Sequence, residues 1–275
     1  MATTAHIEKA GGSIGTDERY IENLTRTATI PTELFDNLYL APKPTARAFA
    51  NPTPLALAGF IMTTTPLSMQ MIGWRGAEGT GAASVGISYF FGGLLMILGG
   101  MLEFVIGNTF SMVVFTCFGG FWLASSATLT PAFNAIGHFK TADFPTGAEN
   151  PQFYDTFGFF YLSMVFLCTI FFICSLRTNI VFAGVFIGLV IAYILLTATY
   201  WSIGLGYHLL AGKLQVAAGW VLLFVVAGGW WVFTVGMLAS VDFPINLPVG
   251  DLSGYIKGAS HKKAQAERAA SSAHS

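Results

Sequence analysis

Six long apolar stretches, separated by short polar segments, dominate the chain from about residue 53 onward. Each stretch is close to the ~20 residues that a helix needs to cross a bilayer. We expect helices over about residues 53–72, 84–106, 109–133, 155–176, 180–203 and 214–240. The pattern therefore predicts an all-α, polytopic membrane protein with six transmembrane helices.

The polar segments divide the chain into four parts. Residues 1–30 are rich in Thr, Gly and charge, which predicts a disordered tail. Residues 31–40 place Leu and aromatic residues at helical spacing. This spacing predicts a short amphipathic helix that lies on the membrane or on a neighbouring subunit; a collapsed loop is the alternative. The segment is part of a proline-containing linker over residues 31–50. The membrane domain then covers residues 51–243, and a second, cytoplasmic tail covers residues 244–275.

The first membrane helix begins with a proline motif, Asn51-Pro52-Thr53-Pro54. Proline suits the first helical turn, because its φ is already near the helical value and the N–H groups there have no intrahelical partner. The Asn51 side chain can accept a hydrogen bond from one of those N–H groups. The positive end of the helix dipole could attract an anion at the membrane face, or the motif could serve only as a good helix start.

Composition supports the membrane assignment. Hydrophobic residues make up 54% of the 275 residues and charged residues only 10%, against about 25% charged in soluble domains. The net charge of −1 argues against a nucleic-acid partner. The three cysteines lie inside apolar stretches, which indicates buried thiols rather than a disulfide framework. The chain has no enzyme, nucleotide-binding or zinc motif, so we expect no enzyme activity, no cofactor and no metal.

Basic residues indicate how the six helices are oriented. Ten of the 13 Lys and Arg residues fall in the two tails and in the joint between the fourth and fifth helices. The opposite side carries only Arg75, Lys140 and Lys213. Basic segments favour the cytoplasmic side, and an even number of helices returns the chain to it. Both termini are therefore expected to be cytoplasmic.

The second helix carries glycines at a seven-residue interval. Seven residues are nearly two helical turns, so these glycines form one smooth stripe that another backbone can approach closely. The stripe could serve packing within the protein or a seam between subunits. Its members are Gly86, Gly93, Gly100 and Gly107, with Gly92 and Gly99 beside them.

Glu103 is the only acidic residue well inside an apolar stretch. A charged carboxylate is costly there, so the side chain should face a cavity, find a donor or be protonated. It could handle a proton or take part in gating, or it could extend from the helix end to the surface, since Gly107 lies only four residues away. His208 is expected in a solvated loop before the sixth helix.

A series of motifs resembles the acetate uptake transporter family, which includes the bacterial succinate–acetate permease and fungal acetate and ammonia-export-linked members. The resemblance begins at Asn51-Pro52-Thr53-Pro54-Leu55-Ala56-Leu57 and continues through Leu102-Glu103, Gly107-Asn108-Thr109-Phe110 and Phe118-Gly119-Gly120-Phe121-Trp122. Residues 247–252, LPVGDL, resemble the ending of the fungal members. The resemblance covers about residues 50–254. It implies six helices per subunit, a homo-hexamer and a substrate path through each protomer.

The resemblance also implies a narrow hydrophobic constriction made by a Phe, a Leu and a Tyr. These positions correspond to Phe60, Leu189 and Phe118, so the chain has Phe where the family has Tyr. An acidic residue that relatives carry near the end of the sixth helix is replaced around Gly236-Met237. These departures suggest a divergent member with an altered substrate or weak transport.

We therefore expect a membrane transporter or channel for acetate and similar small monocarboxylates. Substrate would be attracted by Asn51, Thr53, Thr63 and Thr64, and Glu103 would exchange a coupled proton with it. The expected partners are a small carboxylate, protons, the bilayer and other copies of the chain, in the plasma membrane. Ammonia or ammonium export and a non-transporting scaffold or sensor are the alternatives.

Overall fold

The computed structural model describes residues 49–77, 81–245, 247–252 and 254–256. The chain divides into two units, Met1–Ala50 and Asn51–Ser275, and the account below concerns the second. The expected tail over residues 1–30, the amphipathic segment over residues 31–40 and most of the second tail lie outside the described residues.

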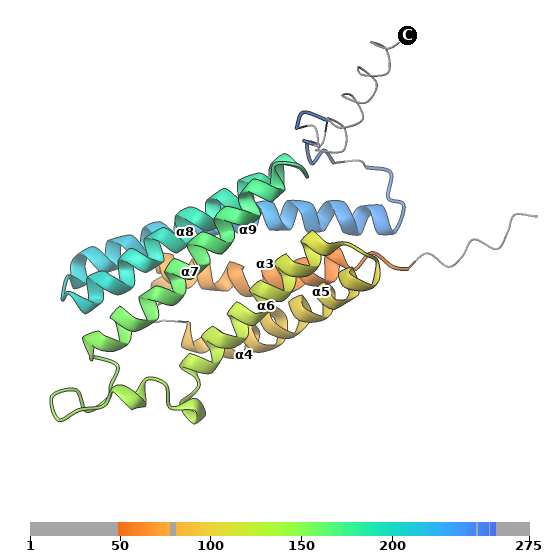
Figure 1. Ribbon diagram of the computed structural model, residues 1–275. Helices are drawn as coiled ribbons and strands as arrows, with labels where there is room; N and C mark the ends of the chain where they lie inside the picture. Colours follow the sequence, from red (N-terminus) through yellow and green to blue (C-terminus); the bar gives the residue numbers. More distant parts are fainter. Residues whose placement is uncertain (1–48, 78–80, 246, 253, 257–275) are drawn as a thin grey trace, which may run out of the picture. The chain divides into compact units, whose positions relative to one another are not determined.

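The prediction of six spanning helices is confirmed for the part of the chain that the structure describes (Figure 1). Five spans are single helices, namely α3 (Thr53–Ile72), α6 (Thr109–Leu129), α7 (Pro151–Ser175), α8 (Ile180–Gly204) and α9 (His208–Ser240). The remaining span is composite and consists of η3 (Ala82–Ser84), α4 (Val85–Ile87), the π-helical segment η4 (Ser88–Leu95) and α5 (Met96–Val105).

Asparagine side chains accept hydrogen bonds from backbone N–H groups at the starts of four of these helices. The Asn51 Oδ1 accepts from the Thr53 N–H at 3.1 Å. Asn108, Asn150 and Asn179 cap α6, α7 and α8 by accepting from a backbone N–H two or three residues further on. Each cap satisfies a donor that the first helical turn leaves free.

The sixth helix begins earlier than the hydropathy pattern predicted. Residues 208–213 belong to α9, and His208 is its first residue rather than part of a loop. With 33 residues, α9 is about 50 Å long, whereas the hydrocarbon core of a bilayer is about 30 Å thick. The polar residues within 208–213 therefore mark where α9 leaves the hydrocarbon, not where the helix starts.

The helices pack in a continuous order. α8 packs against both α7 and α9, α9 packs against α3, and α3 packs against the η4–α5 span, which in turn packs against α6 (Figure 1). Large aromatic side chains complete the contact of α6 with α7 and α8. The Phe121 ring stacks on Phe160 at 5.5 Å between centroids and meets Tyr193 edge-on at 5.4 Å.

The glycine stripe is used for packing inside the protein. A Cβ atom on Gly99 would lie 2.7 Å from the Cβ of Ala56 in α3, and one on Gly92 would lie 2.5 Å from the Trp122 side chain in α6. These distances are well below van der Waals contact, so the second span sits close to both neighbours because it lacks side chains there. Nothing lies within 4 Å of the Cβ position at Gly86 or Gly107.

The segment after α9 returns to the joint between α7 and α8. The Ile180 N–H donates to the Gly250 carbonyl at 2.8 Å, and the Leu252 N–H donates to the Thr178 carbonyl at 3.0 Å. The Trp231 indole N–H of α9 also donates to the Pro248 carbonyl at 3.0 Å. The motif over residues 247–252 thus links the start of α8 to the second half of α9.

Candidate functional site

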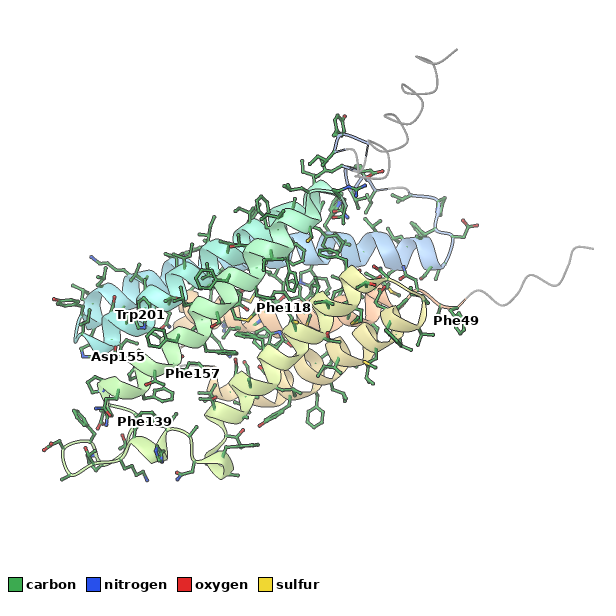
Figure 2. All side chains as sticks on the ribbon, in the orientation of Figure 1. Phe49, Phe118, Phe139, Asp155, Phe157 and Trp201 are labelled. Atoms are coloured by element: carbon green, nitrogen blue, oxygen red, sulfur yellow. The ribbon has the colours of Figure 1, made fainter. Side chains whose placement is uncertain are left out.

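Phe60, Phe118 and Leu189 come together in the middle of the bundle, although they belong to α3, α6 and α8. Their side chains are buried, with 7%, 3% and 3% of their surface exposed. Two cavities of ≈ 30 Å³ each lie next to these residues, and the three are the lining residues that the two cavities share. We call this set the central ring; Figure 2 shows Phe118 lying among the helices.

One of the two cavities lies towards the beginnings of α3, α6 and α8, near Asn51, Asn108 and Asn179. We call it the apolar cavity. Each of its lining residues is a hydrocarbon or thioether residue or glycine. They are Leu57, Phe60, Met96, Val114, Phe115, Phe118, Phe182, Val185, Phe186, Leu189 and Gly229.

The cavity on the other side of the ring, called the central cavity, carries polar groups. Beside the ring residues it is lined by Thr64, Leu67, Phe121, Trp122, Tyr193, Leu196 and Leu222. Leu67, Phe121 and Trp122 also line a larger cavity of ≈ 160 Å³, called the loop-end cavity, which lies towards the 134–150 loop. The three cavities therefore follow one another along the bundle, each sharing lining residues with the next.

Buried donors without a partner gather on this series of cavities. The hydroxyls of Thr64, Ser125 and Ser126 and the indole N–H of Trp122 have no hydrogen-bond partner among the described residues. Thr64 lines the central cavity, Ser125 and Ser126 line the loop-end cavity, and Trp122 lines both. Leaving a buried donor unpaired costs about 1–3 kcal/mol. Four such groups along one route suit a small solute that carries hydrogen-bond acceptors.

Of the four residues expected to attract substrate, Thr64 alone lines one of the three cavities. The Thr63 hydroxyl donates to the Gly59 carbonyl at 2.9 Å within α3. Asn51 is exposed and caps α3, while the Thr53 hydroxyl donates to Glu103. The structure does not gather these four residues into one group, since Thr53 and Thr64 lie about 16 Å apart along the helix.

Glu103 is fully buried, with 0% of its surface exposed. Its Oε1 accepts from the Thr53 hydroxyl of α3, and its Oε2 accepts from the Asn108 side chain at 2.8 Å. The carboxylate thus joins the end of α5 to the starts of α3 and α6. This arrangement excludes the alternative in which the side chain extends to the surface. Glu103 lies outside the linings of the three cavities, about 10 Å along the helix from Met96, which lines the apolar cavity.

The sequence interpretation missed the polar lining of the loop-end cavity. Ser125 and Ser126 form an adjacent polar pair within the third apolar stretch, and Trp122 closes the Phe118–Trp122 motif. A polar pair inside a spanning helix is the signal that could have identified them, because such groups need a partner in hydrocarbon.

Fold and cavities together define a polytopic membrane protein with an internal series of small cavities that meets at an apolar ring. The chain belongs to the GPR1/FUN34/yaaH family, whose sequence model matches residues 37–254. The resemblance inferred from the motifs is thereby confirmed.

Curated relatives in this family cover much of the chain. The protein is 40% identical over 260 residues to protein alcS of Aspergillus fumigatus, an alignment that covers 92% of this chain and 93% of alcS. It is 34% identical over 205 residues to acetate transporter protein patA of Penicillium expansum, covering 74% and 78% of the two chains. It is also 30% identical over 204 residues to ammonia transport outward protein 3 of Saccharomyces cerevisiae, covering 74% and 67%.

A solved structure supports the same relationship. The bacterial acetate channel SatP superposes with a TM-score of 0.59 at 28% sequence identity, and the match covers 74% of this chain and 99% of the SatP chain. The fold therefore matches that of SatP, and the protein is an integral membrane protein whose relatives include transporters and channels.

Proposed function

We propose that this protein carries acetate or a similarly small monocarboxylate across the membrane, with the central ring as the constriction. The observation that carries the proposal is the series of three cavities, with unpartnered donors leading to a ring that three helices share. A carboxyl group offers two oxygen acceptors to these donors, and a methyl group suits the apolar ring. The relatives named for acetate support the same substrate class.

The lining of the path supports a proposal of proton coupling. None of the residues that line the three cavities is Asp, Glu, Lys or Arg. An anion would lose its hydration there without gaining a countercharge, whereas the neutral acid crosses apolar surroundings far more easily. The solute therefore passes the ring together with a proton. Glu103 lies at the end of α5, beside the starts of α3 and α6, and exchanges that proton with the solute.

Ammonia or ammonium is the second candidate, because a relative is named for outward ammonia transport. The aromatic rings of the central cavity could face a cation. The unpartnered hydroxyls can donate or accept, but the indole N–H of Trp122 can only donate, whereas an ammonium ion needs acceptors. The indole therefore favours the carboxylic acid.

The proposed working form is a homo-hexamer in the plasma membrane with both termini in the cytoplasm, as inferred from the family resemblance and the basic residues. The internal use of Gly92, Gly93, Gly99 and Gly100 means that subunits would meet through other faces. Mass photometry in mild detergent tests the assembly, and a monomer as the only species would refute it.

Uptake by proteoliposomes tests the function and the ring together. The pure protein should take up labelled acetate faster under an inward proton gradient than without one. Leu189→Ala should widen the ring and admit lactate or succinate faster than the wild type does. Phe118→Tyr should restore the family hydroxyl and raise acetate uptake.

Leu189 also belongs to the hydrophobic core, where such a truncation costs about 2–5 kcal/mol. Rates are therefore normalised to folded protein in the liposomes. Leu223→Ala, a partly buried Leu outside the linings of the three cavities, is the matched control. If Leu189→Ala gains no substrate range over Leu223→Ala and Phe118→Tyr leaves the acetate rate unchanged, the ring assignment is wrong. If the wild type moves neither acetate nor ammonia, a scaffold or sensor role replaces transport.

A further inference from the structure

A wide hollow of ≈ 720 Å³ lies beyond the loop-end cavity, at the end of the bundle where the 134–150 loop and the turn between α8 and α9 meet. Its lining includes Glu149, His208 and Gln215, so it is polar and suited to contact with water. It shares two lining residues with the loop-end cavity, Ala148 and Tyr154. These two residues form the boundary between the hollow and the series of cavities.

A hydrogen bond joins the two boundary residues. The Tyr154 hydroxyl donates to the Ala148 carbonyl at 2.8 Å, and thereby ties the first turns of α7 to the loop that precedes it. The loop is braced on either side of this carbonyl. The Ala148 N–H donates to the Thr146 hydroxyl at 3.2 Å, and the Asn150 side chain donates to the Phe139 carbonyl at 2.9 Å.

The Tyr154 ring packs against a residue that lines the loop-end cavity. Its centroid lies 5.7 Å from that of Tyr200 in α8, which lines the loop-end cavity but not the hollow. Figure 2 shows the surrounding end of α7, where Asp155 and Trp201 lie beside each other. The Trp201 indole N–H donates to the Asp155 carbonyl at 3.2 Å, which holds α7 and α8 together there. The hydroxyl bond of Tyr154 joins a single side chain to the loop, so rotation of that side chain alone would break it.

We propose that Tyr154 is the access residue of the path: its bond to Ala148 closes the boundary, and the path opens when that bond breaks. A tyrosine hydroxyl that donates to a peptide carbonyl can donate in the same way to an oxygen of a carboxyl group. A small monocarboxylate arriving in the hollow would replace the carbonyl as the acceptor and then meet the unpartnered hydroxyls of Ser125 and Ser126. The inference rests on the proposed function for the solute, but the boundary itself can be tested without transport.

The test measures how fast a thiol reagent reaches the loop-end cavity. Ser126→Cys introduces a reporter thiol, and the full-length protein in detergent is treated with a small methanethiosulfonate reagent. Adding Tyr154→Phe keeps the ring and removes the hydroxyl. Loss of one neutral hydrogen bond should raise the labelling rate about 2- to 12-fold. Tyr207→Phe is the matched control, because Tyr207 is exposed at the same end and lies outside the loop-end cavity.

Native cysteines separate opening of the boundary from loss of the fold. Cys174 is exposed and Cys117 is half-buried, so both are replaced by Ser in the parent and in every variant. The remaining native thiol, Cys168, is fully buried and lies outside the linings of the cavities described here, so its labelling in the parent without the reporter measures general unfolding. Faster labelling of the reporter with slow labelling of Cys168 supports the proposal. An unchanged reporter rate, an equal gain with Tyr207→Phe, or equal acceleration at Cys168 would overturn it. Failure of acetate uptake by the wild type would reject the proposed function and leave the labelling result intact.

Discussion

Replacing Glu103 separates its role in holding helices together from its role in proton exchange. The carboxylate accepts one hydrogen bond from Thr53 and one from Asn108. Glu103→Gln keeps one oxygen that can accept from Asn108, and its amide N–H can donate to the Thr53 hydroxyl, which can also accept. Both bonds can therefore re-form, but as neutral bonds worth about 0.5–1.5 kcal/mol each instead of about 1.5–3 kcal/mol for a bond to a charged group. Glu103→Gln should therefore lose about 2–3 kcal/mol of stability, and Glu103→Ala, which removes both bonds while Asn108 keeps its bond to Ser111, should lose more.

The stability arm is a thermal unfolding experiment in mild detergent, followed by tryptophan fluorescence. At about 2–4 °C per kcal/mol, the expected fall in Tm for Glu103→Gln is roughly 4–12 °C. Glu149→Gln is the matched control, since Glu149 is exposed in the 134–150 loop, and it should change stability by less than about 0.5 kcal/mol. A Tm for Glu103→Gln equal to that of Glu149→Gln would refute the structural role of the two hydrogen bonds.

The transport arm compares initial acetate uptake at several pH values, normalised to folded protein. If Glu103 exchanges the proton, Glu103→Gln should flatten the pH dependence by more than the loss of folded protein explains. A pH profile that keeps the wild-type shape at equal protein would leave Glu103 with the structural role alone. The two experiments are independent, because the first measures thermal stability and the second measures the rate of acetate uptake.

Two further predictions concern close packing and the central cavity. Gly99→Ala should destabilise the protein by about 1–3 kcal/mol through overpacking, because its Cβ would lie 2.9 Å from the Ala56 backbone nitrogen. Gly120→Ala, whose Cβ would have nothing within 4 Å, should leave the Tm unchanged or raise it. Equal changes in Tm for the two variants would contradict the packing account. Thr64→Val should lower initial acetate uptake about 2- to 12-fold by removing one donor to the solute. Thr63→Val should leave uptake unchanged, since that hydroxyl bonds within α3, and equal uptake by both variants would remove Thr64 from the path.

The spans could be predicted from the sequence because their signals are local. Apolar length and, for α3, the proline motif after Asn51 act within a few residues, and they placed α3 and α8 almost to the residue. The start of α9 was wrong, since hydropathy reports the limit of the hydrocarbon and not the limit of hydrogen bonding along the helix. The π-helical segment η4 carries no local signal that distinguishes it from the α-helix around it.

The path depends on information that local patterns do not contain. Thr63 and Thr64 are identical neighbours. The Thr63 hydroxyl bonds to a carbonyl of its own helix, and only the packing of α3 in the bundle places Thr64 on the central cavity. The central ring was placed by family resemblance, not by spacing, because its members come from three helices. The boundary at Ala148 and Tyr154 depends on how a loop folds back onto α7, which neither composition nor periodicity describes.

The wholly apolar lining of the apolar cavity has a consequence for the energetics of the membrane itself. A buried water needs two to four polar partners, and apolar cavities stay dry. Protons travel quickly through proteins along files of hydrogen-bonded water, so a dry compartment at this depth breaks such a file. Under the proposed function, a proton would cross this compartment only when it is bound to the acid. Transport would then use the proton gradient in proportion to the acid moved, with no separate proton leak through the protein.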